Sequence, residues 1–430
     1  MRTIAFKTFG CKANAVDTDA LYQDAIKRGF KVVAEDQAAD AYVINSCTVT
    51  HHADRDARAQ VMRYRRKNPD ALISVVGCYA QVAKQDLLHM TQVDFVLGTA
   101  EKARVLDLFT EKWEGKAVER DQVTKPLGYL PEKFPGSRNA RAPIKIQDGC
   151  NFNCSFCIIP AARGRSRSLP MGAVLAQIND AYAEGFNEVV LTGIHIAHYG
   201  WDRGTDLMTL MKQALATPTG PRLRVSTLDP FEIPDELIDM LADNRRLCPH
   251  LHIAIQSGSD KVLAGMRRIY KAKEFEEVTA KIKAKAPHTF IGVDVIVGFP
   301  GEDAQEFENT VQCLERSFWT KLHVFSYSER EGTRSVGMDE KIPPQEIARR
   351  SEVLRKMSDE RHLAFLQSQV GRQFEVLLEK PFTKKPGFWT GHTENYLPTL
   401  LEIPSGETRS LVTAVAIAVE GERVICQLVN

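Results

Sequence analysis

The chain has 430 residues, enough for roughly two to four domains, and its 43% hydrophobic and 26% charged content is ordinary for a globular protein. The formal net charge of +1 excludes a global basic field, so any contact with RNA or DNA must come from local patches. The opening stretch MRTIAFKTFGCKAN lacks the apolar core of a signal peptide, and no run of about 18 apolar residues occurs, so we expect a cytoplasmic chain without a membrane span.

The first 115 residues alternate short apolar runs with amphipathic stretches, which is the pattern of a parallel sheet covered by helices. Strands are expected at 3–11, 41–47, 72–78 and 94–98. Helices are expected between them, at 15–29, 53–67 and 80–90. We therefore predict an N-terminal parallel α/β domain over residues 1–115.

Each of the first three strands of this domain ends in a cysteine, namely Cys11, Cys47 and Cys78. The carboxyl ends of parallel strands lie along one edge of a sheet, where α/β proteins bind ligands. A single cysteine at such a position could be a buried residue without chemistry. Three cysteines at equivalent strand ends favour a shared set of metal ligands.

Residues 116–142 hold three prolines, many charges and few apolar runs, and they are predicted to form a linker. A second βα series follows over 143–368. Its six expected strands are 143–149, 188–196, 222–228, 250–258, 290–299 and 321–328. Six parallel units predict a partial (βα)6 barrel, short of the usual eight, with its chemistry at the carboxyl ends of the strands.

Residues 369–430 contain short β-rich runs and no helical period. A small closed β-barrel of the oligonucleotide-binding kind fits this length and composition. Phe388, Trp389 and Tyr396 could stack on bases there, or they could belong to the core of the small barrel.

The stretch DGCNFNCSFC, residues 148–157, places Cys150, Cys154 and Cys157 after the first barrel strand. Structural zinc and ordinary iron–sulfur sites use four protein ligands, whereas three thiolates on a four-iron cluster leave one iron open to a small molecule. A zinc site completed by a distant histidine, or incidental thiols, are the alternatives. The remaining cysteines are expected to be small buried residues: Cys248, Cys313 and Cys426.

The spacing C-x3-C-x-aromatic-C after the first strand of a partial barrel resembles the radical S-adenosylmethionine (SAM) enzymes. The resemblance implies a 4Fe–4S cluster whose open iron binds the amine and carboxylate of SAM, and one-electron cleavage of SAM to a 5′-deoxyadenosyl radical. Phe156 would then pack beside the cluster, and Thr192 and Gly193 would meet the methionyl amine. Polar groups at other strand ends are also expected to contact SAM, namely Arg224, Ser226, Gln256 and Asp294.

The N-terminal cysteines ahead of such a barrel, together with the β-rich C-terminal segment, resemble the methylthiotransferases and their TRAM domain. The resemblance implies a second 4Fe–4S cluster on Cys11, Cys47 and Cys78, a tRNA substrate, an external electron donor and a sulfur donor. NSCTVTHHADRDAR and GHTENYL resemble the branch that acts on N6-threonylcarbamoyladenosine next to the anticodon. The isopentenyladenosine enzymes and the ribosomal-protein aspartate enzymes are the alternatives within the family. A zinc-stabilised RNA-binding protein and a two-cluster electron-transfer protein are the alternatives outside it.

Local basic groups supply candidates for RNA contact. Arg163, Arg165 and Arg167 follow the cluster loop at the barrel mouth, and the helix at 53–67 adds further arginines. A solvated charged face is the other interpretation of both groups. His51 and His52 are expected to begin that helix rather than to bind metal. We expect a monomer.

Overall fold

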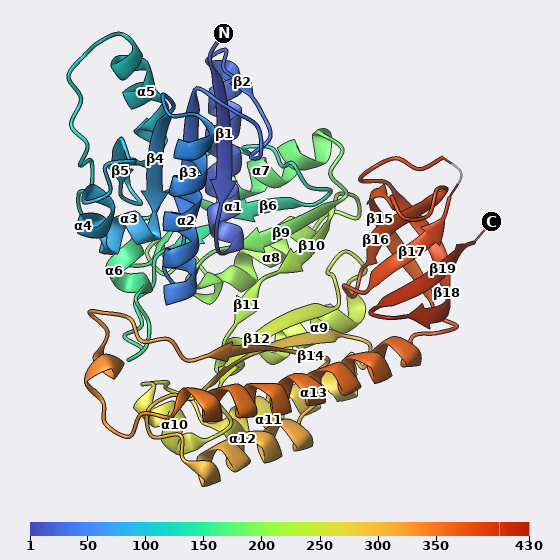
Figure 1. Ribbon diagram of the computed structural model, residues 1–430. Helices are drawn as coiled ribbons and strands as arrows, with labels where there is room; N and C mark the ends of the chain where they lie inside the picture. Colours follow the sequence, from blue (N-terminus) through green and yellow to red (C-terminus); the bar gives the residue numbers. More distant parts are fainter. Residues whose placement is uncertain (404, 430) are drawn as a thin grey trace.

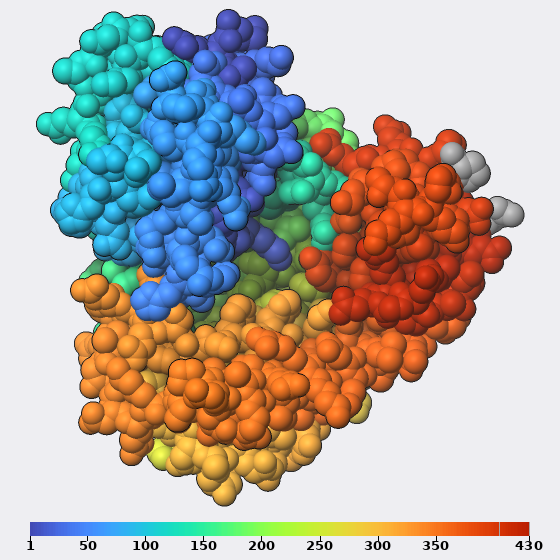
Figure 2. All heavy atoms as spheres, in the orientation of Figure 1, coloured from blue at the N-terminus to red at the C-terminus, as the bar shows by residue number. Residues whose placement is uncertain are grey.

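The computed structural model describes residues 1–403 and 405–429, which fold into three units. A parallel α/β sheet comes first, an open βα barrel follows, and a small closed β-barrel lies at the C-terminal end (Figure 1). Figure 2 shows a hollow on one face, bordered by the N-terminal unit, the central barrel and the C-terminal barrel. The predicted three-part α/β architecture is confirmed.

The N-terminal unit is a five-stranded parallel sheet in the order β2-β1-β3-β4-β5. Its central strands are buried along their whole length and read as continuous apolar runs, as expected for a parallel sheet covered on both faces. The strands are β1 (Thr3–Thr8), β2 (Lys31–Val32), β3 (Ala41–Ser46), β4 (Leu72–Gly77) and β5 (Phe95–Leu97). The helices are α1 (Lys12–Lys27), α2 (His51–Lys67), α3 (Cys78–Val82), α4 (Lys84–Leu88), the 3-10 helix η1 (Glu101–Arg104) and α5 (Val105–Trp113).

Two local differences from the expected elements have simple causes. The helix expected at 80–90 is two short helices, because the backbone at Ala83 leaves the helical region (φ −131°, ψ 43°). The strand β2 has only two residues, too few to produce a sequence period.

The central barrel follows the predicted order of six parallel strands, but it consists of two sheets, β10-β9-β6 and β11-β12-β13-β14. The strand expected at 222–228 is interrupted at Ser226, which separates β10 from β11. The barrel strands are β6 (Ala142–Lys145), β9 (Glu188–Thr192), β10 (Arg222–Val225), β11 (Thr227–Leu228), β12 (His250–Gln256), β13 (Phe290–Val297) and β14 (Lys321–Ser326). At the mouth, β7 (Gln147–Asp148) pairs antiparallel with β8 (Arg167–Ser168).

Helices cover the outside of this barrel, and α12 (Ala304–Arg316) shows why they form. The Asp303 side chain accepts a hydrogen bond from the Glu306 amide and caps the first turn. Phe307, Cys313 and Leu314 recur at helical spacing and are buried against the sheet. The other helices are α6 (Ile159–Arg163), α7 (Met171–Ala183), α8 (Leu207–Leu215), α9 (Asp235–Asp243), α10 (Asp260–Gly265), α11 (Ala272–Lys285) and α13 (Pro344–Ser368), with 3-10 helices η2 (Ile196–His198), η3 (Pro230–Glu232) and η4 (Arg334–Gly337).

The C-terminal unit is a closed barrel in the order β15-β16-β17-β19-β18. Its strands are β15 (Gln373–Pro381), β16 (Phe388–Thr393), β17 (Pro398–Glu402), β18 (Leu411–Glu420) and β19 (Arg423–Leu428). Alternate side chains of β15 point into a core that also contains Leu366 of α13 and Phe290 of β13. The small barrel is therefore packed against the central one.

The segment 116–141 contains no helix or strand, yet it is closely packed. Leu130 and Phe134 contact the core of the central barrel, and the Gly128 amide donates to the carbonyl of Arg163. A second connection joins the units near α2, where the Arg330 guanidinium contacts Thr48 and Asp54 at 2.6 Å. Among the described residues, no helix is long and apolar enough to cross a membrane.

Candidate functional site

The three N-terminal cysteines lie at the carboxyl ends of adjacent strands, as the topology requires. Cys11 precedes α1, Cys47 follows β3, and Cys78 begins α3 directly after β4. Gly10, at φ +93°, allows the loop to approach Cys47, because a Cβ there would lie 2.7 Å from the Cys47 Sγ. We call Cys11, Cys47 and Cys78 the N-terminal triad.

The barrel triad, Cys150, Cys154 and Cys157, occupies the loop after β7 at the mouth of the central barrel. All three side chains line a cavity of about 480 Å³, and Cys11 and Lys12 line the same cavity from the N-terminal unit. The structure therefore brings one triad opposite a member of the other across one space.

Most residues predicted to contact SAM also line this cavity. Four of them, Thr192, Gly193, Ser226 and Gln256, stand at the carboxyl ends of barrel strands. Phe156 lies in the loop of the barrel triad, and Asp294 lies within β13 rather than at its end. The Gln147 side-chain carbonyl accepts hydrogen bonds from the Ile194 and His195 amides, which fixes the turn after β9. Asp294 Oδ1 is 2.7 Å from His252 Nε2.

Arg224 does not line this cavity, so the prediction that it contacts SAM is corrected. Its Nε lies 2.8 Å from Glu188 Oε1, and Arg222 contacts the other oxygen of the same carboxylate at 2.7 Å. Glu188 is paired with Arg222 across the β9–β10 ladder. It holds both guanidinium groups on the side that faces the C-terminal barrel.

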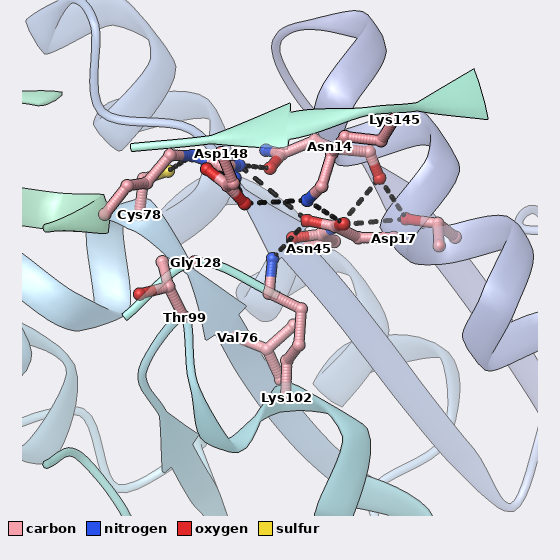
Figure 3. Close-up of polar contacts among 12 residues, drawn as sticks. Asn14, Asp17, Asn45, Val76, Cys78, Thr99, Lys102, Gly128, Lys145 and Asp148 are labelled. Carbon is pink, nitrogen blue, oxygen red and sulfur yellow. Dashed lines mark hydrogen bonds and ion pairs between the residues drawn. The ribbon is translucent and has the colours of Figure 1, made fainter. Parts of the chain in front are cut away.

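A buried network of charged side chains connects the N-terminal unit, near Cys78, with Lys145 and Asp148 of the central barrel (Figure 3). Asp17 of α1 contacts Lys102 Nζ at 2.6 Å and also pairs with Lys145 of β6. Lys145 contacts Asp148 at 2.8 Å, and Arg163 of α6 contacts the same carboxylate at 2.9 Å. All five side chains are fully buried, so this network fixes the N-terminal sheet against the barrel.

Arg163 is therefore not available to RNA, and that prediction is wrong. Its Nε donates to the Sγ of Cys78 at 3.2 Å, and its Nη2 donates to the Asn14 side-chain oxygen. The network contains three cations, Lys102, Lys145 and Arg163, but only two carboxylates, Asp17 and Asp148. The Sγ of Cys78 is the further acceptor that one of these cations, Arg163, contacts.

Arg165 and Arg167, the other two arginines predicted to contact RNA, have different surroundings. Arg165 is exposed to solvent, whereas Arg167 is half-buried and donates to the Gly128 carbonyl. On α2, Arg65 is tied to Asp94, while Arg55, Arg63 and Arg66 are exposed. His51 begins α2, as expected.

Cationic groups also stand beside the barrel triad. Arg268 Nη1 donates to the Sγ of Cys154 at 3.2 Å, and Arg268 is held by Asp229. His195 Nδ1 lies 3.8 Å from the Sγ of Cys150, and its Nε2 lies 2.6 Å from Glu232. Burial lowers the pKa of His195, but the contacts with Cys150 and Glu232 outweigh burial and raise it to about 10. Each triad thus has a positive side chain aimed at a sulfur. At Cys154 burial outweighs Arg268 and raises the pKa of the thiol.

Burial acts against ionisation of the most enclosed cysteines. It raises the pKa of Cys47 to about 11 and that of Cys157 to about 12. Such thiols keep their protons at neutral pH unless a metal displaces them. Three thiols and an adjacent cation at each triad fit a cluster held by three thiolates, and Cys11 of the N-terminal triad is exposed.

Comparisons with known proteins agree with this chemistry. The family model described as "Uncharacterized protein family UPF0004" matches residues 3–98, and that of the Radical SAM superfamily matches residues 144–314. The chain is 35% identical over 378 residues to "Threonylcarbamoyladenosine tRNA methylthiotransferase MtaB" of Aquifex aeolicus, which covers 87% of this chain and 92% of that protein. The protein of the same name from Bacillus subtilis is 35% identical over 409 residues, covering 94% of this chain and 91% of that protein.

A relative with another name is slightly less similar. "tRNA-2-methylthio-N(6)-dimethylallyladenosine synthase" of Carboxydothermus hydrogenoformans is 32% identical over 385 residues, covering 86% of this chain and 87% of that protein. Among solved structures, the radical S-adenosylmethionine methyltransferase TsrM of Kitasatospora setae matches with a TM-score of 0.56 at 15% identity. That match covers 76% of this chain and 73% of TsrM and reflects a shared fold.

Proposed function

We propose a function for this chain, which belongs to the methylthiotransferase family of radical SAM enzymes: it converts N6-threonylcarbamoyladenosine in tRNA to its 2-methylthio derivative. The observation that carries the proposal is the single cavity lined by Cys11 and by all three cysteines of the barrel triad. Insertion of sulfur at a carbon–hydrogen bond needs a radical source and a sulfur source within reach of the same atom. One cavity lined by the barrel triad and by Cys11 of the N-terminal triad meets that need.

The two triads are proposed to hold one 4Fe–4S cluster each, with SAM at the open iron of the barrel cluster. When bound, these groups supply the electron that cleaves SAM and the sulfur that enters the substrate. The chain holds SAM through residues of the barrel strands and of the turns that follow them. Thr192 and Gly193 face the methionyl end, while Ser226, Gln256 and Asp294 supply hydrogen-bonding groups for the amino acid and the ribose. Phe156 excludes water beside the cluster.

Several residues serve by positioning others. Asp229 holds Arg268 against Cys154, and Glu232 holds His195 against Cys150. Gln147 fixes the turn that carries Thr192 and Gly193 toward the cavity. Such outer contacts tune the sulfur ligands and keep the reacting groups in register.

We infer a threonylcarbamoyl substrate rather than a prenylated adenosine from the names of the relatives. Five relatives at 33–35% identity are named for threonylcarbamoyladenosine, whereas those named for the dimethylallyl substrate are at 29–32%. Arg165 and the exposed arginines of α2 are proposed to contact the tRNA backbone. An external electron donor and a sulfur donor complete the system, which we place in the cytoplasm with its tRNA.

The test is nucleoside mass spectrometry of total tRNA after treatment with anaerobically reconstituted protein, SAM and a reductant. We expect threonylcarbamoyladenosine to gain a methylthio group, and no product with Cys154→Ala protein. A methylthio group on isopentenyladenosine alone would assign the chain to the other tRNA substrate. Cleavage of SAM without any change in tRNA would remove tRNA as the substrate and make the ribosomal protein the next one to test.

A further inference from the structure

A second cavity, of about 520 Å³, lies where the three units meet. Its lining comes from α1, from the segment before β6, from β9 and β10, and from the C-terminal barrel at Glu379, Lys380 and Tyr396. Lys12, the residue directly after Cys11, lines both this cavity and the one that holds the barrel triad. The two spaces therefore adjoin beside the N-terminal triad.

The second cavity is strongly cationic. One carboxylate, Glu379, faces six positive side chains, which are Lys12, Arg138, Arg141, Arg224, Lys380 and Arg409. Arg138 is paired with Asp19, and Arg141 with Glu379 at 2.7 Å. Lys12 has no ion-pair or hydrogen-bond partner in residues 1–403 and 405–429.

Arg224 provides a second, independent observation. The side chain is only 1% exposed, and its Nη1 atom is buried without a hydrogen-bond partner within the described chain. Its Nε and Nη2 are used by Glu188, so Nη1 is the donor left for the cavity. A buried guanidinium donor without an acceptor is costly, and an anion bound in the cavity would supply that acceptor.

The aromatic ring of Tyr396 contacts two of these cations, Arg224 and Arg141. Its ring centroid lies 4.8 Å from the guanidinium carbon of Arg224 and 5.0 Å from that of Arg141. The backbone of Tyr396 is held at φ +69°, an unusual conformation for a residue other than glycine, in the turn between β16 and β17. Burial raises the pKa of Tyr396, but Arg141, Lys12 and Arg224 outweigh it and lower the pKa, so the potential in the cavity is positive.

We propose that this second cavity binds the carboxylate of the threonylcarbamoyl group, with Lys12, Arg141 and Arg224 as its cationic partners, an inference that rests on the proposed function. Carbon 2 and carbon 6, which carries the N6 nitrogen, belong to the same six-membered ring of adenine, so a carbon 2 presented beside Cys11 keeps the N6 substituent close to Lys12. A prenyl group carries no charge and offers no acceptor to Lys12 or to the buried Nη1 of Arg224. The cavity thereby selects the anionic substituent and rejects the apolar one.

A phosphate of the RNA backbone is the other source of a single negative charge, and the experiment distinguishes the two. One tRNA carries the natural carboxylate and a matched tRNA carries its neutral methyl amide. The rate constant kcat/KM for methylthio formation is measured for both with the reconstituted wild-type protein. Loss of one charge-assisted contact predicts a preference for the carboxylate of about 10-fold to 100-fold.

The variants Lys12→Met and Arg141→Gln should each reduce the ratio of the two kcat/KM values toward one, while Lys12→Arg retains most of it. Lys12 directly follows Cys11, whereas Arg141 is not next to a triad cysteine, so the Arg141 variant tests the inference if Lys12→Met loads less iron. Lys273→Met, on the outer helix α11, is the control and should leave the ratio unchanged.

Equal use of the carboxylate and the amide by the wild-type protein would overturn the inference while leaving the proposed function intact. A variant that slows both substrates equally would also overturn it, because a phosphate contact or a structural role acts on both. No methylthio product from either tRNA would refute the proposed function itself.

Discussion

Arg163 Nε lies 3.2 Å from the Sγ of Cys78, while Nη1 of the same guanidinium lies 2.9 Å from Asp148, two residues before Cys150. A single side chain thus links the N-terminal triad to the start of the loop that carries the barrel triad. Since the guanidinium is fully buried, it acts as a rigid spacer between the two sites and adds positive charge beside a sulfur ligand.

Replacing Arg163 should destabilise this junction. Arg163→Gln leaves Asp148 and Asp17 with less compensation in a buried environment, where loss of one partner typically costs about 3–5 kcal/mol. We expect a lower melting temperature and less iron per chain after reconstitution. Arg165→Gln, in the same loop but exposed, should change stability by less than about 0.5 kcal/mol. Equal melting temperatures for the two variants would contradict this role.

The two triads should have separable functions. Cys154→Ala should abolish formation of 5′-deoxyadenosine, whereas Cys47→Ala should retain some SAM cleavage and lose sulfur insertion. Iron analysis should give about eight irons for the wild-type protein and about four for each variant. Cys426→Ala, in the small barrel, should load iron normally. If both triad variants lost SAM cleavage and sulfur insertion to the same extent, the proposal that the two triads have separate functions would be wrong.

Stability should depend on pH through Glu188. Burial raises the pKa of this carboxyl, but Arg224 and Arg222 outweigh burial and hold it well below its usual 4.5. A pKa lowered by folding contributes stability above the unfolded value, and that stability is lost as the pH falls. Glu188→Gln should therefore melt below the wild type at pH 7, by an amount equivalent to about 3–5 kcal/mol, and the difference should shrink below about pH 4. If the difference in melting temperature between the wild type and Glu188→Gln stayed constant down to low pH, Glu188 would not be the source of the pH dependence. Glu352→Gln, on the exposed face of α13, serves as the control.

Arg268 should set the reduction potential of the barrel cluster. A cation that donates to Cys154 stabilises the reduced, more negative form. Arg268→Gln should lower the potential by on the order of tens of millivolts, as measured by a redox titration followed by electron paramagnetic resonance. The exposed neighbour Arg267 provides the matched control in Arg267→Gln. An unchanged potential in the Arg268 variant would exclude an electrostatic role.

The sequence was sufficient for features that depend on local pattern. Strand-end positions predicted that Cys11, Cys47 and Cys78 would share one sheet edge, and the alternation of β and α segments predicted the barrel order. It was insufficient for side chains whose partners lie far along the chain. Arg163 contacts Cys78, which is 85 residues away, and Arg224 is held by Glu188, which is 36 residues away. A sequence reveals that an arginine is charged but not which carboxylate or thiol it contacts in the folded chain.

The same limit applies to the second cavity. Lys12, Arg141, Arg224 and Tyr396 come from three units and carry no joint spacing signal. The nearest available sign was the stretch GHTENYL, which contains Tyr396, but its contact with Arg224 exists only because the small barrel packs against β10.

The most direct test of the account is a competition between two tRNAs in one reaction. Equal amounts of a tRNA with threonylcarbamoyladenosine and a tRNA with isopentenyladenosine are incubated with the reconstituted protein, SAM and a reductant, and nucleosides are then measured by mass spectrometry. The account predicts 2-methylthio-threonylcarbamoyladenosine as the product, with the prenylated nucleoside unchanged. Methylthiolation of the prenylated nucleoside at an equal or higher rate would contradict it.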